Sequence, residues 1–165
     1  MISPEVLRRY PFFSRLSMDQ ITALAKLATE KTVETDYFFL REDEESSNFY
    51  LLLEGAVAIV FELPERDVEH KISDQFTRKL QTRDVVVSTV GPGDVFGWSG
   101  LIPPHKATAG AKAVTPCRVV SFDCIELIKE FEKDCAFGYL MTQKAAQVIS
   151  ERLRDVRIES LSTIV

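Results

Sequence analysis

Between residues 33 and 122 the chain consists of short β-prone runs with turn signals between them. The runs are rich in aromatic and β-branched residues and lie at 37–40, 48–53, 56–61, 85–90 and 111–122. Glu54-Gly55 and Gly91-Pro92-Gly93-Asp94 have the composition of tight turns. Short strands in succession favour an antiparallel roll or barrel, because a doubly wound sheet requires strands and helices to alternate.

Helical signals precede these strands. Ser3-Pro4 is typical of an N-cap followed by proline at the first helical position, which predicts a short helix ending near Pro11. Ser17 and Gln20 have the spacing of a capping box. Apolar residues then recur at helical spacing, at Ile21, Leu24, Ala25 and Ala28. We therefore expect helices over residues 1–32.

Helical signals return after the last strand. Asp123 is a candidate N-cap with Glu126 at the capping-box position, and Asp134 is a candidate cap for a final long helix. On that helix, apolar and small residues recur at spacings of three and four, at Ala146, Ile149, Leu153, Val156 and Ser160. Residues 123–165 are therefore predicted to be helical.

A chain of 165 residues buries a sizeable core as one domain, so we expect a single domain over residues 1–165. The expected fold class is mainly β with flanking helices. Its centre is an antiparallel double-stranded β-helix, a jelly-roll-like β-roll, over residues 33–122. Residues 62–84 are strongly charged and are predicted to form a hairpin arm of that roll.

Charge and hydropathy exclude several protein classes. The net charge of −5 lacks the basic footprint of a nucleic-acid binder. No apolar run approaches the roughly 18 residues that a membrane-spanning helix needs. The N-terminus does not have the pattern of a secretory signal. We therefore expect a cytoplasmic protein with no membrane contact.

Residue types also argue against catalytic and metal sites. Two histidines and three cysteines without C-x-x-C spacing give little support to a metal centre, and the cysteines are expected to be buried thiols. Ser99 lacks the G-x-S-x-G context of a hydrolase nucleophile. No enzymatic activity is expected.

The stretch GPGDVFGWSGLIPPHKATAGAKA at 91–113 combines glycines with a helix-starting character, which allows backbone N–H groups to approach an anion. Its candidate ligand-binding residues are Phe96, Gly97, Trp98, Ser99, Gly100, Leu101, Lys106, Ala107 and Thr108. The Trp98 indole either stacks on a ligand or fills the pocket. Lys106 either contacts a phosphate or is a solvated surface residue, and His105 is expected at the surface.

Four segments resemble the cyclic nucleotide-binding domain superfamily, in particular the sensor domains of catabolite activator-like bacterial regulators. They are PFFSRLS at 11–17, FFLREDEESSNFYLLLEGAVAIVF at 38–61, GPGDVFG at 91–97 and AKAVTPCRVVSFDCIELI at 111–128. The resemblance implies an eight-stranded β-roll whose phosphate-binding cassette wraps a cyclic nucleotide. It also implies flanking helices that move when the ligand binds.

The cassette departs from the family pattern at its two charged positions. In that pattern a glutamate follows the Phe-Gly pair and holds the ribose, and an arginine about ten positions later pairs with the phosphate. This chain has Trp98 at the first position and Ala107 at the second, with Lys106 one step before. Lys106 and Ala107 cannot both face a ligand unless the strand bulges. Asp43 also replaces the glycine of an REGD-like turn.

We expect from these features a non-catalytic sensor module with an altered cassette. Binding of cyclic AMP is doubtful, and the ligand is expected to be a cyclic nucleotide or another small anion, held by the amides of residues 98–101. The alternative is a degenerate roll, closed by Trp98, that acts as a dimerisation or protein-interaction scaffold. The resemblance implies a homodimer through the C-terminal helix and an effector protein of unknown identity.

Direct DNA binding is not expected. Arg152, Arg154 and Arg157 alternate with acidic residues, which is typical of the solvated flank of a packing helix. The chain stops at Val165, where regulators of this type continue into a helix-turn-helix domain.

Overall fold

A computed structural model of the protein describes residues 2–64 and 82–162. The helical elements are α1 (Pro4–Arg8), η1 (Pro11–Phe13), α2 (Met18–Leu27), η2 (Trp98–Leu101), α4 (Cys124–Lys133) and α5 (Cys135–Ser162). The strands are β1 (Ala28–Val33), β2 (Phe38–Leu40), β3 (Asn48–Glu54), β4 (Val57–Pro64), β5 (Thr82–Val90), β6 (Val95–Phe96), β7 (Gly110–Ala113) and β8 (Cys117–Asp123). The order helix, strands, helix is the one that the sequence predicts.

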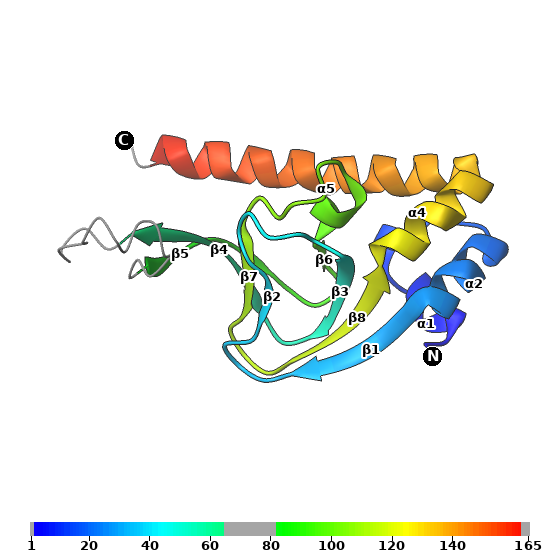
Figure 1. Ribbon diagram of the computed structural model, residues 1–165, viewed down its shortest axis with the longest axis horizontal. Coiled ribbons are helices and arrows are strands. Elements are labelled where there is room, and N and C mark those ends of the chain that lie inside the picture. Colours follow the sequence, from blue (N-terminus) through cyan, green and yellow to red (C-terminus); the bar gives the residue numbers. More distant parts are fainter. Residues whose placement is uncertain (1, 65–81, 163–165) are drawn as a thin grey trace.

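The strands form two antiparallel sheets, one ordered β1-β8-β3-β6 and the other β2-β7-β4-β5. Figure 1 shows α5 lying along one side of this roll, while α1, α2 and α4 gather at one end of it. The predicted fold class, mainly β with flanking helices and a long C-terminal helix, is confirmed. The two sheets do not close into a barrel.

The boundary predicted at the first strand is wrong. Ala28–Val33 is a strand rather than the end of a helix, and it pairs with β8 from Ala28↔Phe122 to Val33↔Cys117. The capping box of α2 is confirmed: Gln20 N–H donates to the Ser17 hydroxyl, and Ser17 N–H donates to the Gln20 side chain. The helical spacing of apolar residues extends to Ala28, one residue beyond the end of α2. Ala28 is buried, as it would be on a helix, so its burial does not distinguish helix from strand. Its pairing with β8 makes it a strand residue.

One other strand prediction needs revision. The run 111–122 is interrupted at residues 114–116, which gives β7 and β8 in different sheets. The two ends of the hairpin arm predicted at 62–84 pair as strands, since β4 and β5 pair from Val57↔Val90 to Pro64↔Thr82. Residues 65–81 of that arm lie outside the described residues.

The core has two parts. One lies between the roll and the helices and contains Leu7, Ile21, Phe49, Phe122 and Met141 among its buried members. The other fills the interior of the roll. There the rings of Phe39, Tyr50 and Phe96 lie with their centroids 5.0–5.2 Å apart, an aromatic arrangement that stabilises beyond area burial alone.

The C-terminal helices begin at the predicted caps. Asp123 Oδ1 accepts from the amides of Ile125 and Glu126, and Asp134 Oδ1 accepts from the amide of Phe137. The Glu126 carboxylate accepts from Lys129 Nζ rather than closing a reciprocal capping box. Each cap satisfies amides that have no partner within the helix.

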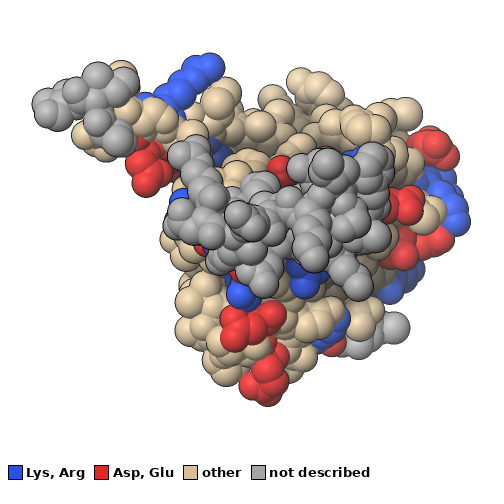
Figure 2. Space-filling view, turned by 60° about the vertical axis from the view of Figure 1, so that its left-hand side comes forward, with Lys and Arg blue, Asp and Glu red and all other residues tan. Residues whose placement is uncertain are grey.

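Beyond Ile149 the apolar residues of α5 are exposed: Leu153, Val156, Ile158 and Leu161 are each at least 44% accessible. In the described part of the chain, no helix is both long and apolar enough to cross a membrane. Figure 2 shows acidic and basic side chains intermingled on one face of the molecule. Cys117 and Cys124 are buried, whereas Cys135 is exposed, which corrects the expectation of three buried thiols.

Candidate ligand-binding site

The cassette, residues 97–109, follows β6 and begins at Gly97. Gly97 has a φ of +81°, and a Cβ atom there would lie 2.7 Å from the Asn48 carbonyl oxygen. At Gly100 a Cβ atom would lie 2.6 Å from both Cys124 Sγ and the Ser46 carbonyl oxygen. These two glycines therefore allow the cassette to lie directly on the roll and on the start of α4.

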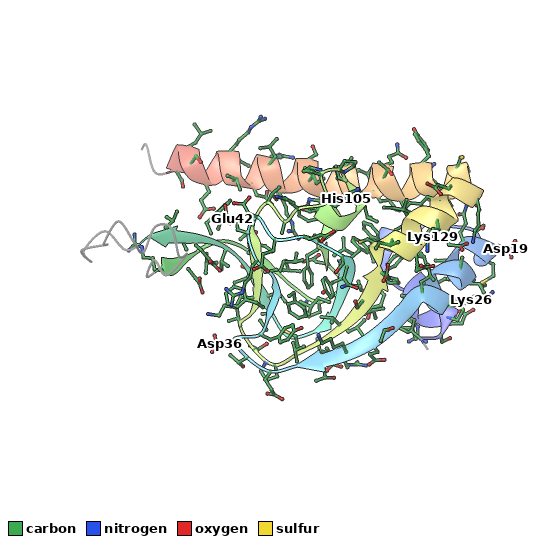
Figure 3. The ribbon with its side chains drawn as sticks, in the orientation of Figure 1. Asp19, Lys26, Asp36, Glu42, His105 and Lys129 are labelled. Carbon is green, nitrogen blue, oxygen red and sulfur yellow. The ribbon has the colours of Figure 1, made fainter. Side chains whose placement is uncertain are left out.

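Backbone hydrogen bonds stabilise the short helix η2 at the start of the cassette. The Gly100 amide donates to the Gly97 carbonyl at 3.3 Å, and the Ile102 amide donates to the Ser99 carbonyl at 3.2 Å. His105 adds a side-chain contact, since its Nδ1–H donates to the Gly100 carbonyl at 2.9 Å. Figure 3 shows His105 below α5. His105 is partly buried rather than simply at the surface.

The second half of the cassette pairs with the turn at residues 43–46. The Asp43 amide donates to the Ala107 carbonyl, and the Ala107 amide donates to the Glu44 carbonyl, both at 2.9 Å. Asp43 has a φ of +62°, a conformation in which glycine is favoured and aspartate is tolerated. Ala107 is 3% exposed, whereas Lys106 and Thr108 are exposed. Lys106 and Ala107 therefore lie on opposite faces, as strand alternation requires.

Trp98 faces α5. The Arg152 guanidinium lies over the indole, 4.4 Å from the ring centroid, and its Nη2 donates to the Val95 carbonyl at 2.9 Å. Such a cation–π contact stabilises by about 0.5–2 kcal/mol, more where it is desolvated. Burial lowers the pKa of the Arg152 guanidinium, and the negative charge of Asp94 opposes this shift.

The interpretation of Arg152 as part of a solvated flank is wrong. Arg152 is partly buried, whereas Arg154 and Arg157 on the same helix are exposed. The helical spacing of Arg152 could have indicated that its side chain packs against the protein. Arg152 lies three residues after Ile149 and four before Val156, so it shares the apolar face of α5.

A cavity of about 430 Å³ separates the cassette from α5. Its wall comprises Trp98, Ser99, Ile102, Pro103, Pro104, Lys106 and Thr108 from the cassette and Ile149, Arg152, Leu153 and Val156 from α5. Its volume lies within the range of small-molecule sites. Trp98 thus forms one wall of this cavity and leaves the rest of it open.

The structure brings together four of the nine candidate residues in this wall, namely Trp98, Ser99, Lys106 and Thr108. Phe96, Gly97, Gly100 and Ala107 are buried, and Leu101 packs against the core between roll and helices. These five shape the cassette from behind. Among the described residues, no three His, Cys, Asp or Glu side chains are grouped so that they could hold a metal ion.

The sequence profile of the cyclic nucleotide-binding domain family matches residues 30–134. The chain belongs to this family. A crystal structure from Geobacter metallireducens, of a protein assigned to the cyclic nucleotide-binding proteins, is 31% identical with a TM-score of 0.76 and covers 93% of this chain and 99% of its own. A cyclic nucleotide-binding domain from Methylobacillus flagellatus has the same fold, with a TM-score of 0.73 at 16% identity over 96% of this chain and 80% of its own.

Curated relatives include the CRP-like cAMP-activated global transcriptional regulator of Mycobacterium tuberculosis. It is 24% identical over 119 residues, which are 72% of this chain and 46% of the regulator. The chain therefore spans about half the length of the curated relatives that it matches. The cyclic nucleotide-binding fold supports a regulatory or sensor module.

Proposed function

We propose that this chain is a non-catalytic sensor module in which the cassette and α5 together hold a small ligand. The observation that carries the proposal is the shared wall of the cavity, with seven residues from the cassette and four from α5. A ligand in this cavity contacts both elements, so its binding free energy depends on how α5 lies against the cassette. Any ligand that prefers one placement of α5 shifts the population towards it.

The proposed output is the position of α5, which an effector protein recognises. The first half of the helix is anchored, since Phe137, Met141 and Ala145 are buried. Beyond Ile149 the helix contacts the cassette region through Arg152, while Leu153 and Val156 are 48% and 44% exposed. This half of α5 is the part that a ligand is placed to move. A homodimer through α5 and a cytoplasmic location are part of the proposal.

Tight recognition of cyclic AMP is not part of the proposal. Trp98 stands where the family's glutamate holds the ribose, and buried Ala107 stands where its arginine pairs with the phosphate. Each lost charge-assisted contact costs about 1.5–3 kcal/mol, or roughly ten- to a hundredfold in affinity. We expect cyclic nucleotides to bind weakly.

A second candidate function is a scaffold that pairs with a second copy of the chain or with another protein. The observation that favours it is the exposure of four apolar side chains on the last turns of α5, at Leu153, Val156, Ile158 and Leu161. Ile158 and Leu161 are neighbours on the helix surface and do not line the cavity described above, so they are the residues available to a partner. In this alternative the cavity has no ligand and α5 serves only for association.

Isothermal titration calorimetry with cyclic AMP, cyclic GMP and cyclic dinucleotides tests the first proposal. We expect saturable heats for at least one of these compounds, in the high micromolar range or weaker. If none of these compounds gives a binding heat at millimolar concentration, the proposal that the chain senses this ligand class is rejected. A dimer in light scattering, combined with that result, favours the scaffold.

A further inference from the structure

The wall of the cavity between cassette and α5 has an unusual charge composition for this protein. It contains two cationic residues, Lys106 and Arg152, two hydroxyl residues, Ser99 and Thr108, and otherwise apolar side chains and prolines, with no carboxylate among the described residues that line it. The chain as a whole has 25 acidic and 20 basic residues. A wall with cations and no acid therefore departs from the average surface of the molecule and favours a negatively charged occupant.

Arg152 has unused capacity to bind an anion. A guanidinium carries five N–H donors, and within the described chain one hydrogen bond is formed, to the neutral Val95 carbonyl. No carboxylate of the described residues forms an ion pair with it. The guanidinium has thus lost part of its hydration to the indole of Trp98, and the charge of Asp94 offsets this loss only in part, without forming an ion pair.

The acidic groups near Arg152 lie outside this cavity. Asp94 and Glu151 line a neighbouring cavity near η1, and Asp155 lines both that cavity and one beside β5. Arg152 lines all three cavities, so its side chain stands where they meet. Its position therefore separates an acid-lined region from one in which the charged residues that the structure describes, Lys106 and Arg152, are both cationic.

We propose that Arg152 of α5, with Lys106 of the cassette, binds the oxyanion of the ligand, a phosphate or carboxylate carried on an apolar or aromatic body. This inference rests on the proposed function and names the chemistry of the same cavity. The arginine fork matches two oxygens of such a group, and the ammonium of Lys106 adds a point charge. The apolar body packs on Ile102, Leu153 and Val156, which line the same cavity.

This arrangement couples the ligand to the helix. The oxyanion replaces the Val95 carbonyl as the acceptor for Arg152, because a charge-assisted hydrogen bond is stronger than one to a neutral carbonyl. Arg152 belongs to α5 and Lys106 belongs to the cassette, so one oxyanion joins both elements. The position of α5 then depends on the presence of the anion.

The test uses the single tryptophan of the chain as a reporter, because Trp98 contacts Arg152 directly. Cyclic AMP, cyclic GMP, phenyl phosphate and benzoate are titrated into the wild type while Trp98 fluorescence and the heat of binding are recorded. Phenyl phosphate and benzoate distinguish a phosphate from a carboxylate, and benzyl alcohol is the uncharged control. We expect saturable binding of at least one anion and at least tenfold weaker binding of benzyl alcohol.

The variants are R152Q, R152K and K106Q, with R154Q as the matched control. Arg154 is exposed on the same helix, so R154Q removes the same charge without touching the cavity. We expect R152Q to weaken anion binding at least tenfold, R152K and K106Q to weaken it severalfold, and R154Q to leave it within twofold of the wild type. The urea midpoint of each variant shows whether it is folded. If R152Q does not fold, K106Q still tests the site, because Lys106 is exposed.

Each other outcome overturns the inference. Anion binding that is equal in R152Q and wild type removes Arg152 from the site while the proposed sensing function stands. An equal loss in R154Q and R152Q assigns the effect to overall charge rather than to a site. If benzyl alcohol binds as well as the anions, the ligand class is wrong but the cavity still binds a ligand. If no probe binds the wild type at 10 mM, both the inference and the proposed function fail.

Discussion

The two faces of the cassette differ in composition and in role. On the inner face, Gly100 and Ala107 are sealed against the roll and the start of α4, next to the buried ring of Phe96 at the end of β6. On the outer face, Trp98 and Lys106 line the open cavity beside α5. The inner face therefore stabilises the fold by packing, and the charged and aromatic side chains of the cassette lie on the outer face. Substitutions on the two faces should therefore affect different properties.

The largest effect is expected for Phe96→Ala. Phe96 is fully buried and its ring lies against those of Phe39 and Tyr50, so truncation leaves a cavity that costs about 3–5 kcal/mol of unfolding free energy. The matched outer-face variant is Ile102→Ala, because Ile102 is 39% exposed and should cost about 0.5 kcal/mol or less. Urea denaturation measures both. Equal losses would remove the distinction between the faces.

Gly100→Ala should have the next largest effect. The added methyl group meets Cys124 Sγ and the Ser46 carbonyl oxygen at 2.6 Å, and overpacking of this kind costs about 1–3 kcal/mol. Gly91→Ala is the control, since the nearest atom to its Cβ is Asp94 Oδ2 at 3.7 Å. Thermal unfolding of the two variants gives the comparison. If Gly100→Ala is as stable as Gly91→Ala, the cassette does not lie directly on the roll.

Trp98→Ala should have a smaller effect on stability and a distinct effect on the cavity. The indole is partly buried and its loss removes the contact with Arg152, which we expect to cost about 1–2 kcal/mol. The cavity becomes wider, while the oligomeric state measured by light scattering stays that of the wild type. A change of oligomeric state would place Trp98 in an association surface rather than in the wall of a ligand site.

The reactivity of the cysteines tests whether the inner face of the cassette is closed to solvent, without a substitution that changes stability. Cys124 contacts the inner face at Gly100, and burial, with a smaller contribution from the charge of Asp123, raises its pKa to about 12. A raised pKa keeps the thiol protonated at pH 8 and therefore unreactive. We expect one thiol, the exposed Cys135, to react promptly with an aromatic disulfide reagent, and C135S to abolish that reaction. Prompt reaction of a second thiol in the folded protein would mean that the inner face is open to solvent.

Much of the fold could be predicted from the sequence because its signals are local. The capping box at Ser17 and Gln20 and the caps at Asp123 and Asp134 depend on neighbouring residues alone. The strand at Ala28–Val33 could not, because its partner β8 lies about 90 residues further along the chain. At Ala28 the spacing of apolar residues and the burial of the side chain fit a helix and a strand equally well.

Only the cassette half of the candidate site could be predicted. The glycines and Trp98 stand within one short stretch, so the sequence indicates a loop and its altered residues. Arg152 comes from a helix more than fifty positions later, and the acidic residues beside it suggest a solvated face. Arg152 lies between Ile149 and Val156 on the apolar face of the helix. This spacing indicates that Arg152 packs against the protein, although the alternating charges suggest a solvated face. Contacts between distant segments depend on the packing of whole elements, which local patterns do not determine.

The claim that the outer face is the ligand face is tested most directly by a titration followed in two-dimensional ¹H–¹⁵N spectra. The indole N–H of Trp98 gives a single resonance because the chain has one tryptophan. With phenyl phosphate we predict a saturable shift of this resonance and unchanged amide resonances for Phe39 and Tyr50 inside the roll. Shifts at Phe39 and Tyr50 with an unmoved indole would contradict the claim.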